Sequence, residues 1–567
     1  MSATQDVDPF SQPFEIGLVM AGAISAGAYT AGVMDFLLQA LDAWYGARAA
    51  GEDVPPHEVR IKVMTGASAG GMTAAISVGA LATRFPPVTD PAAADSAVNK
   101  LFDSWVNRID IAALLGVQDL ADPKAPVRSV LDSTILRTIA DQALGVAPAA
   151  ERRAYLDDVL HVIATVSNLR GVPYSIPLEG EIKGGQDLFL HADYFHFAVS
   201  DRGEQSVPGA LSLDWQMADA RWRPGWDTLK LVALATGAFP VGLAPRTLSY
   251  DFAGATGDVY ALRKWPVPTG GAKDANGDCH CVEYEVIAPN WPAVPQRYDF
   301  VCVDGGLMNN EPLELARQVL AGSGGYNPRG ANSARRAVIL VDPFPGGAEV
   351  QSAYEPRDDL VTVVKDMFTA LKNQARFKPE ELELAQDPNV FSRFLIGPTR
   401  TDANGRNCEF PIASGTLGGF GGFLSRDFRL HDFMLGRRNC QRFLARRFVL
   451  GENNPLFDRW KGPQRERYAV ERDGHTLLPV IPLVGEAATE VPALPWPRYP
   501  AARLAELEKQ IEARFTAVGD RLVSGFLADK YFARKAAQFA LWRKRGDLVQ
   551  YAMDRVKKDL ARFGLLA

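Results

Sequence analysis

Residues 14–84 contain two successive patterns of strand, loop and helix, and these patterns constrain the fold more than any other feature of the chain. The apolar runs FEIGLVM and VRIKVMT each precede a turn of small residues, which leads into a segment with helical spacing of apolar side chains. Strands that alternate with helices at this spacing predict a parallel sheet with helices on its faces. We therefore expect an α/β fold with a three-layer α/β/α core around a mainly parallel central sheet.

The pattern changes twice along the rest of the chain. Residues 85–157 are mostly helical and punctuated by prolines, which indicates a helical insertion that lies over the sheet. Strand signals return from about residue 160, and RRAVILVDPFP at 335–345 is the last run typical of a core strand. Long helical patterns then dominate, beginning with DLVTVVKDMFTALKNQ at 359–374. We expect an α/β domain over 10–345, with the insertion at 85–157, and a mainly helical C-terminal region over 350–567.

Composition favours a globular protein of a reducing compartment. Apolar residues make up 47% and charged residues 23%, and the net charge of -6 argues against nucleic-acid binding. Five cysteines in 567 residues are too few for a disulfide framework. The N-terminus lacks a signal-peptide pattern, and no apolar stretch reaches the roughly 18 to 20 residues of a membrane span. We therefore expect a cytoplasmic protein. Residues 501–567 carry 14 Lys+Arg against 8 Asp+Glu, a local +6, which is typical of a solvated helical face and also fits peripheral contact with an anionic membrane.

Ser68 is the centre of the stretch Gly66-Ala67-Ser68-Ala69-Gly70, which fits G-x-S-x-G and lies between a predicted strand and a predicted helix. In a nucleophile elbow the serine is strained, and the positions two before and two after it approach too closely for side chains. The turn places Ser68 at a helix N-terminus, where the dipole favours an alkoxide and the N–H of Ala69 can face an oxyanion. Close packing of a helix start on a strand explains the same small residues, so this stretch alone leaves both interpretations open.

Two further turns of small residues also follow apolar strands. In GLVMAGAISAGAYTAGV at 17–33, exposed backbone N–H groups can hold an anion or an oxyanion. In VCVDGGLMNNEP at 301–312, an apolar strand delivers Asp304 to the flexible turn Gly305-Gly306. Taken singly, the first is equally explained by close packing of helix on sheet, and the second by a capping aspartate.

Together and in this order, the three elements resemble the patatin-like phospholipase family, which has a Gly-rich loop after its first strand, then G-x-S-x-G, and D-G-G/A much later. The stretch ATVSNLRGVPYSI at 164–176 is similar to the central strand of that family and the turn after it. ALATGAFPVGLAPR at 233–246 resembles its A-S-x-A-x-P-x-x-F-x-P segment. The joint match spans about 14–345 and is far more specific than any one motif, and it implies a patatin-like core.

The resemblance implies a Ser–Asp dyad without histidine, with Ser68 as nucleophile and Asp304 as general base. It implies that the Gly-rich loop supplies oxyanion donors, although Gly22-Ala23-Ile24-Ser25-Ala26-Gly27 departs from the usual G-G-G-x-R/K-G. We expect these donors to be the backbone N–H groups of Gly22, Ala23, Ile24 and Ala69. The structural glycines of the three motifs are Gly27, Gly66, Gly70, Gly305 and Gly306. The implied function is a serine acyl hydrolase that cleaves lipid carboxylic esters through an acyl-enzyme and needs no metal or other cofactor.

Two alternative functions remain open. A catalytically impaired relative that binds lipid or a partner fits the altered loop, although the presence of both Ser68 and Asp304 argues against it. An α/β-hydrolase with a Ser-His-Asp triad needs a histidine after the acid, and only His431 and His475 follow Asp304. Such folds also place several strands before the elbow, whereas about one precedes it here.

The remaining polar clusters are better explained as structural. Cys279-His280-Cys281 is too tightly spaced for a zinc knuckle. Asp274, Asn276, Asp278 and Glu285 imitate a calcium loop, but Cys279 occupies the position that requires glycine. We interpret His161, His191 and His196 as structural histidines. In RLHDFMLGRR we expect Arg437 and Asp432 to pair or hydrogen-bond and so to fasten the C-terminal region onto the core, with lining of an acyl channel as the alternative.

Overall fold

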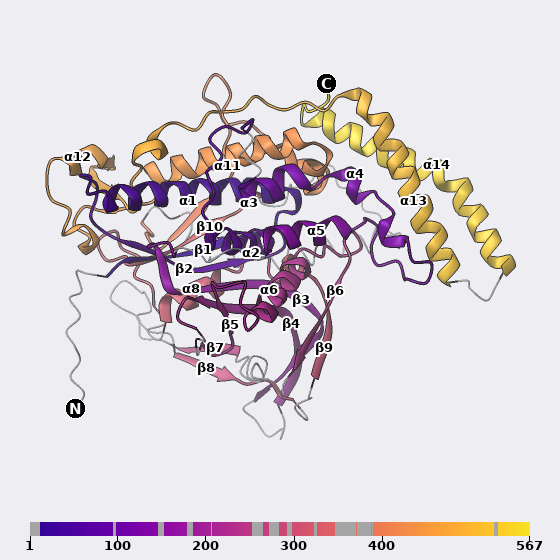
Figure 1. Ribbon diagram of the computed structural model, residues 1–567, viewed down its shortest axis with the longest axis horizontal. Coiled ribbons are helices and arrows are strands. Elements are labelled where there is room, and N and C mark those ends of the chain that lie inside the picture. Colours follow the sequence, from indigo (N-terminus) through magenta and orange to yellow (C-terminus); the bar gives the residue numbers. More distant parts are fainter. Residues whose placement is uncertain are drawn as a thin grey trace.

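The computed structural model describes residues 12–567 apart from 94–97, 146–151, 178–184, 204, 206, 252–264, 271–282, 292–296, 323–325, 346–369, 371–386, 388 and 527–530. A mainly parallel sheet lies in the middle of the molecule, helices cover its faces, and two long C-terminal helices extend from one end (Figure 1). This is the α/β architecture with a helical C-terminal region that the sequence predicts. The helical pattern at 359–374, apart from residue 370, and the expected boundary near 350 lie outside the described residues.

The central sheet has nine strands within the described residues. They are β1 (Phe14–Met20), β2 (Val59–Gly66), β3 (Leu156–Pro177), β4 (Gly185–Ser200), β5 (Leu211–Asp214), β6 (Arg246–Asp251), β9 (Arg297–Asp304), β10 (Arg336–Val341) and β11 (Arg393–Ile396). The order is β11-β10-β1-β2-β3-β4-β5, and β9 pairs with both β3 and β6. The strands from β11 to β3 are parallel, whereas β4 and β9 join β3 in antiparallel register. Met20 pairs with Gly66, so β1 and β2 end side by side and their turns of small residues meet at one edge.

Helices and smaller strands complete the fold. The helices are α1 (Gly27–Ala49), α2 (Ala69–Leu81), α3 (Lys100–Phe102), α4 (Ile111–Leu114), α5 (Thr134–Ala143), α6 (Arg223–Thr236), α8 (Leu313–Ala321), α11 (Arg426–Arg446), α12 (Gln464–Tyr468), α13 (Leu504–Phe526) and α14 (Tyr531–Arg562). Short helical turns are η1 (Ile24–Ala26), η3 (Asp103–Arg108), η4 (Gln118–Leu120), η5 (Gly305–Leu307), η7 (Ala413–Gly419), η8 (Gly421–Leu424), η9 (Pro455–Phe457), η10 (Gly485–Ala488) and η11 (Ala501–Arg503). The smaller strands are β7 (Trp265–Gly270), β8 (Glu283–Ile287), β12 (Val449–Gly451), β13 (Val470–Arg472) and β14 (His475–Pro479).

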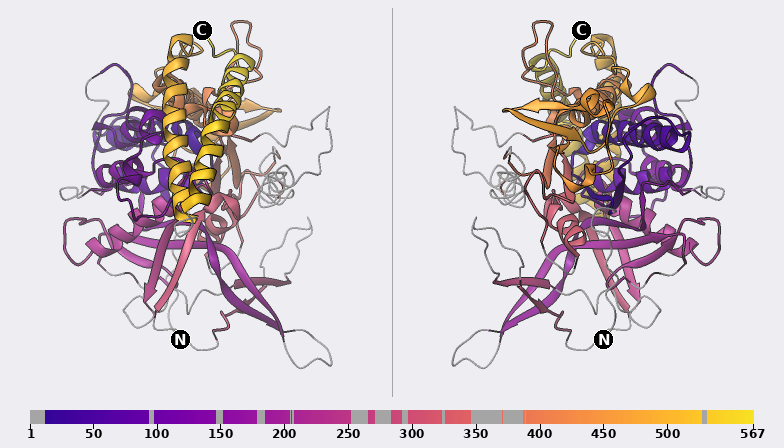
Figure 2. Two further views of the ribbon diagram at one scale, coloured as in Figure 1. Left: turned by 90° about the vertical axis from the view of Figure 1, so that its right-hand side faces the viewer. Right: turned by 90° about the vertical axis from the view of Figure 1, so that its left-hand side faces the viewer.

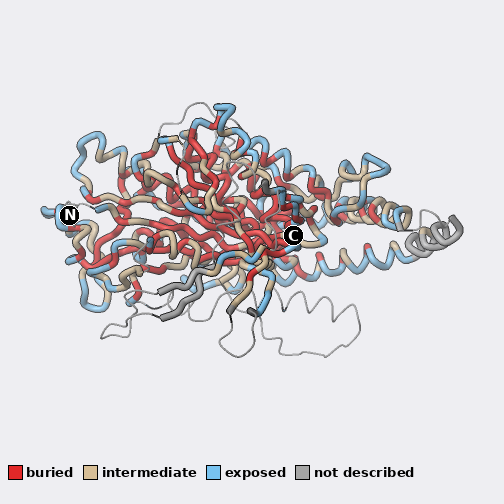
Figure 3. The backbone as a smooth tube through the Cα atoms, turned by 90° about the horizontal axis from the view of Figure 1, so that it is seen from below, coloured by how far each residue is buried: buried red, intermediate tan, exposed pale blue. Residues whose placement is uncertain are grey.

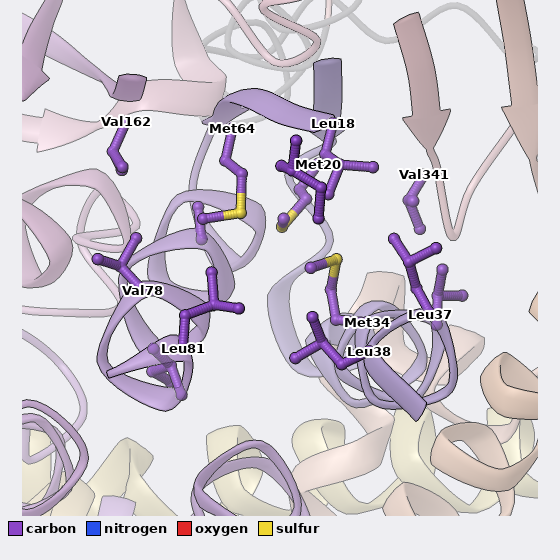
Figure 4. Close-up of a cluster of buried hydrophobic side chains, with 14 of the residues drawn as sticks. Leu18, Met20, Met34, Leu37, Leu38, Met64, Val78, Leu81, Val162 and Val341 are labelled. Carbon is purple, nitrogen blue, oxygen red and sulfur yellow. The ribbon is translucent and has the colours of Figure 1, made fainter. Parts of the chain in front are cut away.

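The sheet is buried on both faces because its apolar side chains alternate between two helical layers. Leu18 and Met20 of β1 point toward α1 and α2, where Met34 and Leu81 lie (Figure 4). Val19, between them in sequence, packs in a separate cluster with α8 on the opposite face. Buried residues accordingly concentrate in the sheet and the helices against it (Figure 3). Continuous apolar strands of this kind are typical of parallel sheets covered on both sides.

The C-terminal region packs directly against the α/β core. Strand β11 extends the sheet beside β10, and α11 lies along α1 (Figure 1). A Cβ atom on Gly32 would lie 1.9 Å from the carbonyl oxygen of Phe433, and one on Gly436 would lie 2.1 Å from that of Tyr29. The two helices therefore touch backbone to backbone, which only glycine allows at these positions.

Arg437 and Asp432 both form buried interactions, but not with each other. Arg437 forms an ion pair with Asp35 of α1, which fastens α11 onto the core as expected. Asp432 instead accepts hydrogen bonds from the N–H groups of Ala413 and Ser414, at 2.9 and 2.8 Å. The expected direct pair is wrong because the two side chains have nearer partners on other segments. Asp432 therefore holds the first residues of the segment 413–424 against α11, and it does not hold α11 against the core.

The helices α13 and α14 lie side by side (Figure 2). They extend away from the sheet at one end of the molecule (Figure 1). Arg514 of α13 anchors this hairpin to the 85–157 segment, since it forms an ion pair with Asp119 at 2.5 Å and donates to the carbonyl oxygen of Val130 at 2.7 Å. Within the described residues, no helix combines the length and apolar character needed to cross a membrane.

Candidate active site

Ser68 lies at a strained turn between β2 and α2. Its backbone has φ of +52° and ψ of −129°, a region that residues with side chains rarely adopt. A Cβ atom on Gly66 would lie 2.5 Å from the carbonyl carbon of Gly70, and one on Gly70 would lie 2.1 Å from the carbonyl oxygen of Met20. The small residues around Ser68 are therefore required by the close approach of β1, β2 and α2.

Ser68 and Asp304 are 236 residues apart in the sequence and hydrogen-bonded in the fold. The Ser68 hydroxyl donates to Oδ2 of Asp304 at 2.6 Å, and the two residues are only 6% and 4% exposed. The other carboxylate oxygen of Asp304, Oδ1, accepts from the N–H of Gly306 at 2.7 Å. Ser167 donates to the Asp304 carbonyl oxygen at 2.7 Å, so the backbone and the carboxylate are both held. This arrangement orients Asp304 to accept the proton of Ser68.

Glycine is also required at the second residue of the dyad. A Cβ atom on Gly305 would lie 2.1 Å from the carbonyl oxygen of Thr165 on β3. One on Gly306 would lie 2.5 Å from the side-chain oxygen of Asn310. The tight turn after Asp304 therefore lets β9 approach β3 closely enough to bring the carboxylate to Ser68.

The loop after β1 keeps an unusual backbone conformation without the usual glycine. Ile24 has φ of +50°, which is a marked outlier for a β-branched residue. The N–H of Gly22 already donates to the carbonyl oxygen of Asn310 at 3.2 Å. In the part of the chain that the structure describes, the N–H groups of Ala23, Ile24 and Ala69 make no hydrogen bond to another protein group. Of the four donors predicted from sequence, these three are open to a ligand.

A small pocket joins the loop to the dyad. It is lined by Gly22, Ala23, Ile24, Ser68, Phe239, Pro240, Asp304, Gly306, Leu307 and Asn310. Its volume is about 30 Å³, which holds about two water molecules. A larger cavity of about 390 Å³ lies beside α1 and is lined by Asp35, Asp42 and Arg153 among others. Among the described residues, no serine, threonine, cysteine, lysine or histidine lines it. The chemistry that the geometry supports therefore belongs to the smaller pocket.

A model of the patatin-like phospholipase family matches residues 18–317. The chain belongs to this family. It is also 40% identical over 556 residues to the uncharacterized protein y4iI of Sinorhizobium fredii. This match covers 90% of this chain and 76% of the relative. The structural match to VipD from Legionella pneumophila covers 95% of this chain and 80% of the VipD chain at 11% sequence identity. Its TM-score is 0.24, so we infer nothing from it. The general activity indicated by the family is hydrolysis of lipid acyl esters.

Residues 413–424 of the C-terminal region hold the Gly-rich loop of this patatin-like protein. The Ser25 hydroxyl donates to the carbonyl oxygen of Gly419 at 2.5 Å and accepts from the N–H of Gly422 at 2.9 Å. Ile24 packs in one apolar cluster with Phe420 and Phe423. These contacts explain how Ile24 keeps the conformation of a glycine, because tertiary packing offsets local strain.

Sequence reasoning missed three positioning groups of the site. Thr236, at the end of α6, accepts the N–H of Ser68 at 2.8 Å, while Ser25 and Asn310 hold the Gly-rich loop. Thr236 and Asn310 lie within the stretches that carry the family resemblance, so these stretches could have indicated that both residues lie near the site. Nothing local to residues 413–424 indicates a contact with a loop almost 400 residues earlier.

The described histidines lie outside the pocket around Ser68. His431 contacts the Asp432 carboxylate at 2.8 Å, and the exposed His475 lies on β14. No histidine lines the pocket around Ser68 among the described residues, so the geometry gives no Ser-His-Asp triad there. His161 and His196 bond to each other at 2.8 Å across β3 and β4, and His191 bonds to the carbonyl oxygen of Asn168 at 2.7 Å. The Cys279-His280-Cys281 stretch and the first positions of the calcium-like loop lie outside the described residues.

Proposed function

We propose that this protein is a serine acyl hydrolase that cleaves carboxylic esters of lipids through an acyl-enzyme on Ser68. The observation that carries the proposal is the 2.6 Å hydrogen bond from the Ser68 hydroxyl to Asp304 at a strained strand-to-helix turn. The turn also places Ser68 at the N-terminus of α2, whose positive dipole end favours developing negative charge.

The first half of the reaction transfers the acyl group to the protein. Asp304 accepts the hydroxyl proton as Oγ of Ser68 attacks the ester carbonyl carbon. The carbonyl π bond opens to an oxyanion, which the N–H groups of Ala23, Ile24 and Ala69 stabilise. When the tetrahedral intermediate collapses, the bond to the alcohol oxygen breaks, and the departing alcohol takes the proton from Asp304.

The second half releases the fatty acid. Asp304 accepts a proton from water as the water oxygen attacks the acyl carbonyl carbon. The same N–H groups stabilise the second oxyanion, and its collapse breaks the bond to Oγ of Ser68. Ser68 regains the proton from Asp304, so each bond and proton is accounted for by groups of the chain, the ester and water.

Contact with a lipid surface would bring long acyl chains to the pocket. Val241 is 75% exposed and directly follows Pro240 of the pocket wall, and Met308 is 38% exposed and follows Leu307. Tyr551 of α14 is 75% exposed on a segment that carries a local positive charge. We propose that this apolar rim and the basic helices make peripheral contact with membranes. Binding to anionic liposomes should weaken as salt rises, and binding that is insensitive to both salt and anionic lipid would contradict the electrostatic part.

The decisive test combines fluorophosphonate labelling with a lipid ester panel. We expect an adduct on Ser68, and we expect Ser68→Ala and Asp304→Asn to lose roughly a thousandfold or more in kcat. Ser77→Ala is a matched control, because Ser77 is buried on the same helix and its hydroxyl has no hydrogen-bond partner. An intact protein that binds lipid but neither labels nor turns over would refute the hydrolase and favour the binding-only alternative.

A further inference from the structure

Three arginines from separate segments gather beside the catalytic pocket. Arg246 begins β6, Arg137 lies on α5, and Arg128 precedes that helix. Residues 128–133 run alongside 241–245, since the N–H groups of residues 130 and 131 donate to the carbonyl oxygens of residues 241 and 242 at 2.8 and 3.0 Å. The Arg128 guanidinium donates to the carbonyl oxygen of Pro245 at 2.6 Å, directly before Arg246.

Among the described residues, Arg246 is buried without a carboxylate partner. It is 7% exposed, and its buried Nε has no hydrogen-bond partner. Within the described residues it forms no ion pair, whereas the buried Arg437 and Arg514 pair with Asp35 and Asp119. A buried, unpaired guanidinium is costly to maintain, so its retention points to an anion that joins it.

The surroundings of Arg246 add positive charge. Burial, followed by the charges of Arg128 and Arg137, lowers the pKa of Arg246 to about 10, so the group is still a cation at neutral pH. The nearby carboxylate of Asp132 accepts backbone N–H groups of residues 118, 119 and 134. Asp119 pairs with Arg514 on α13. These two carboxylates therefore face other partners, although Asp132 keeps its negative charge, and the charges that act on Arg246 are those of Arg128 and Arg137.

The strand register places this charge next to the dyad. Arg246 lies opposite Cys302, two residues before Asp304 on β9. Cys302 and Asp304 both belong to the buried face of β9, because burial alternates along that strand. Side chains two residues apart share a face at about 7 Å separation, so Arg246 is on the face of Asp304 and about that far along the strand. A phosphate a few bonds from an ester held at Ser68 falls within the reach of an arginine at this position.

We propose that Arg246, with Arg128 and Arg137, forms a site for a phosphate group beside the dyad. Guanidinium groups suit this ligand, because their planar fork donates two parallel hydrogen bonds to phosphate oxygens. If the phosphate is a lipid head group, the site selects phospholipids over neutral esters, and this part rests on the proposed hydrolase function. If it is free phosphate, the same three residues bind it independently of catalysis.

Calorimetric titration of the full chain carrying Ser68→Ala tests the site without turnover. The probes are inorganic phosphate, a short-chain phosphatidylcholine below its micelle concentration, and a neutral diacylglycerol of the same chain length. We expect Arg246→Met to weaken phosphate binding by about tenfold or more, Arg137→Gln to weaken it less, and Arg223→Gln to leave it unchanged. Arg223 is the matched control because it is exposed at the start of α6, away from the cluster.

A purely structural role for Arg246 gives a different result. Since Arg246→Met removes an unpaired buried charge, its Tm without ligand should equal or exceed that of the parent. If this variant does not fold, Arg246→Lys and Arg137→Gln provide the affinity comparison. Equal phosphate affinity in all variants would overturn the site, as would an equal loss for the neutral lipid. Arg246-dependent binding of phosphate but not of phosphatidylcholine would support the site and assign it to free phosphate.

Turnover by the protein with Ser68 intact separates this inference from the proposed function. We expect Arg246→Met to lower the ratio of kcat/KM for phosphatidylcholine to that for the neutral ester by about tenfold. An unchanged ratio overturns the lipid assignment while leaving hydrolysis intact. If neither ester is hydrolysed, the proposed function fails, and the phosphate titration still decides whether the site exists.

Discussion

Replacing Ser25 by alanine tests whether the C-terminal region positions the oxyanion loop. The Ser25 hydroxyl donates to the carbonyl oxygen of Gly419 at 2.5 Å and accepts from the N–H of Gly422 at 2.9 Å. Both bonds are buried, so the alanine variant leaves a carbonyl and an N–H without partners. Each such group costs about 1 to 3 kcal/mol, or about 2 to 6 kcal/mol together. Separation of residues 419–422 from the loop relieves this cost, because both groups can then reach water.

That separation removes the packing that holds Ile24 at φ of +50°. A non-glycine residue in this region is strained by about 1 to 3 kcal/mol, so the backbone relaxes and turns the Ile24 N–H away from the pocket. Loss of one oxyanion donor typically costs about 2.7 to 4 kcal/mol, or about 10² to 10³ in kcat. We therefore expect Ser25→Ala to lower kcat by about a hundredfold, with a small change in KM.

Steady-state kinetics with a soluble short-chain ester, together with the rate of fluorophosphonate labelling, measures this effect. Ser77→Ala is again the matched control, because its buried hydroxyl makes no hydrogen bond whose loss leaves a partner unsatisfied. A Ser25→Ala protein that is less stable yet retains the wild-type kcat would refute the reasoning. That result would show that the two bonds stabilise the fold without positioning the loop.

Two further substitutions test the packing of the elbow and the cost of a buried histidine. Gly70→Ala places a Cβ 2.1 Å from the carbonyl oxygen of Met20, so we expect a lower Tm and a loss of activity. Gly46 lies on α1, and a Cβ there would have no heavy atom within 4 Å, so Gly46→Ala should stabilise the fold by about 0.5 to 1 kcal/mol. Thermal denaturation and ester turnover measure both, and normal activity in Gly70→Ala would contradict the close approach. Burial lowers the pKa of His57 to about 4, so from pH 7 to pH 5 the unfolded chain takes up a proton that the folded chain does not. The free energy of unfolding therefore falls as the pH drops below about 6.5, and His57 should lower that of the wild type by about 2 kcal/mol between pH 7 and pH 5. The decrease over the same pH range should be smaller by about that amount in His57→Gln. Unfolding free energies measured at pH 7 and pH 5 test this, with His475→Gln as the control because His475 is exposed. A pH dependence in His57→Gln equal to that of the wild type would refute it.

Local patterns predicted much of the α/β core, and they singled out Ser68 and Asp304, which the fold brings into a hydrogen bond. The strands FEIGLVM and VRIKVMT are mostly apolar because both faces of the sheet are buried, and the charged exceptions, Glu15, Arg60 and Lys62, are half-buried and lie in the first half of each strand. That requirement acts on each strand separately. The elbow around Ser68 is only partly local: Gly66 faces Gly70 within the same turn, whereas Gly70 makes room for Met20 of β1. Strand β11 has four residues and no periodic pattern, so its place beside β10 was not predictable.

The sequence by itself determined the two local turns, because a strained serine turn at Ser68 and an aspartate before two glycines at Asp304 each need particular neighbours in the chain. The tertiary structure decided which groups hold and surround them. It paired Arg437 with Asp35 rather than with Asp432, and it brought Ser25 to residues 413–424 across almost 400 positions. It also left Arg246 buried without a carboxylate partner in the part of the chain that the structure describes. Such partners depend on how distant segments fill a shared volume, and a short window of sequence contains no trace of that.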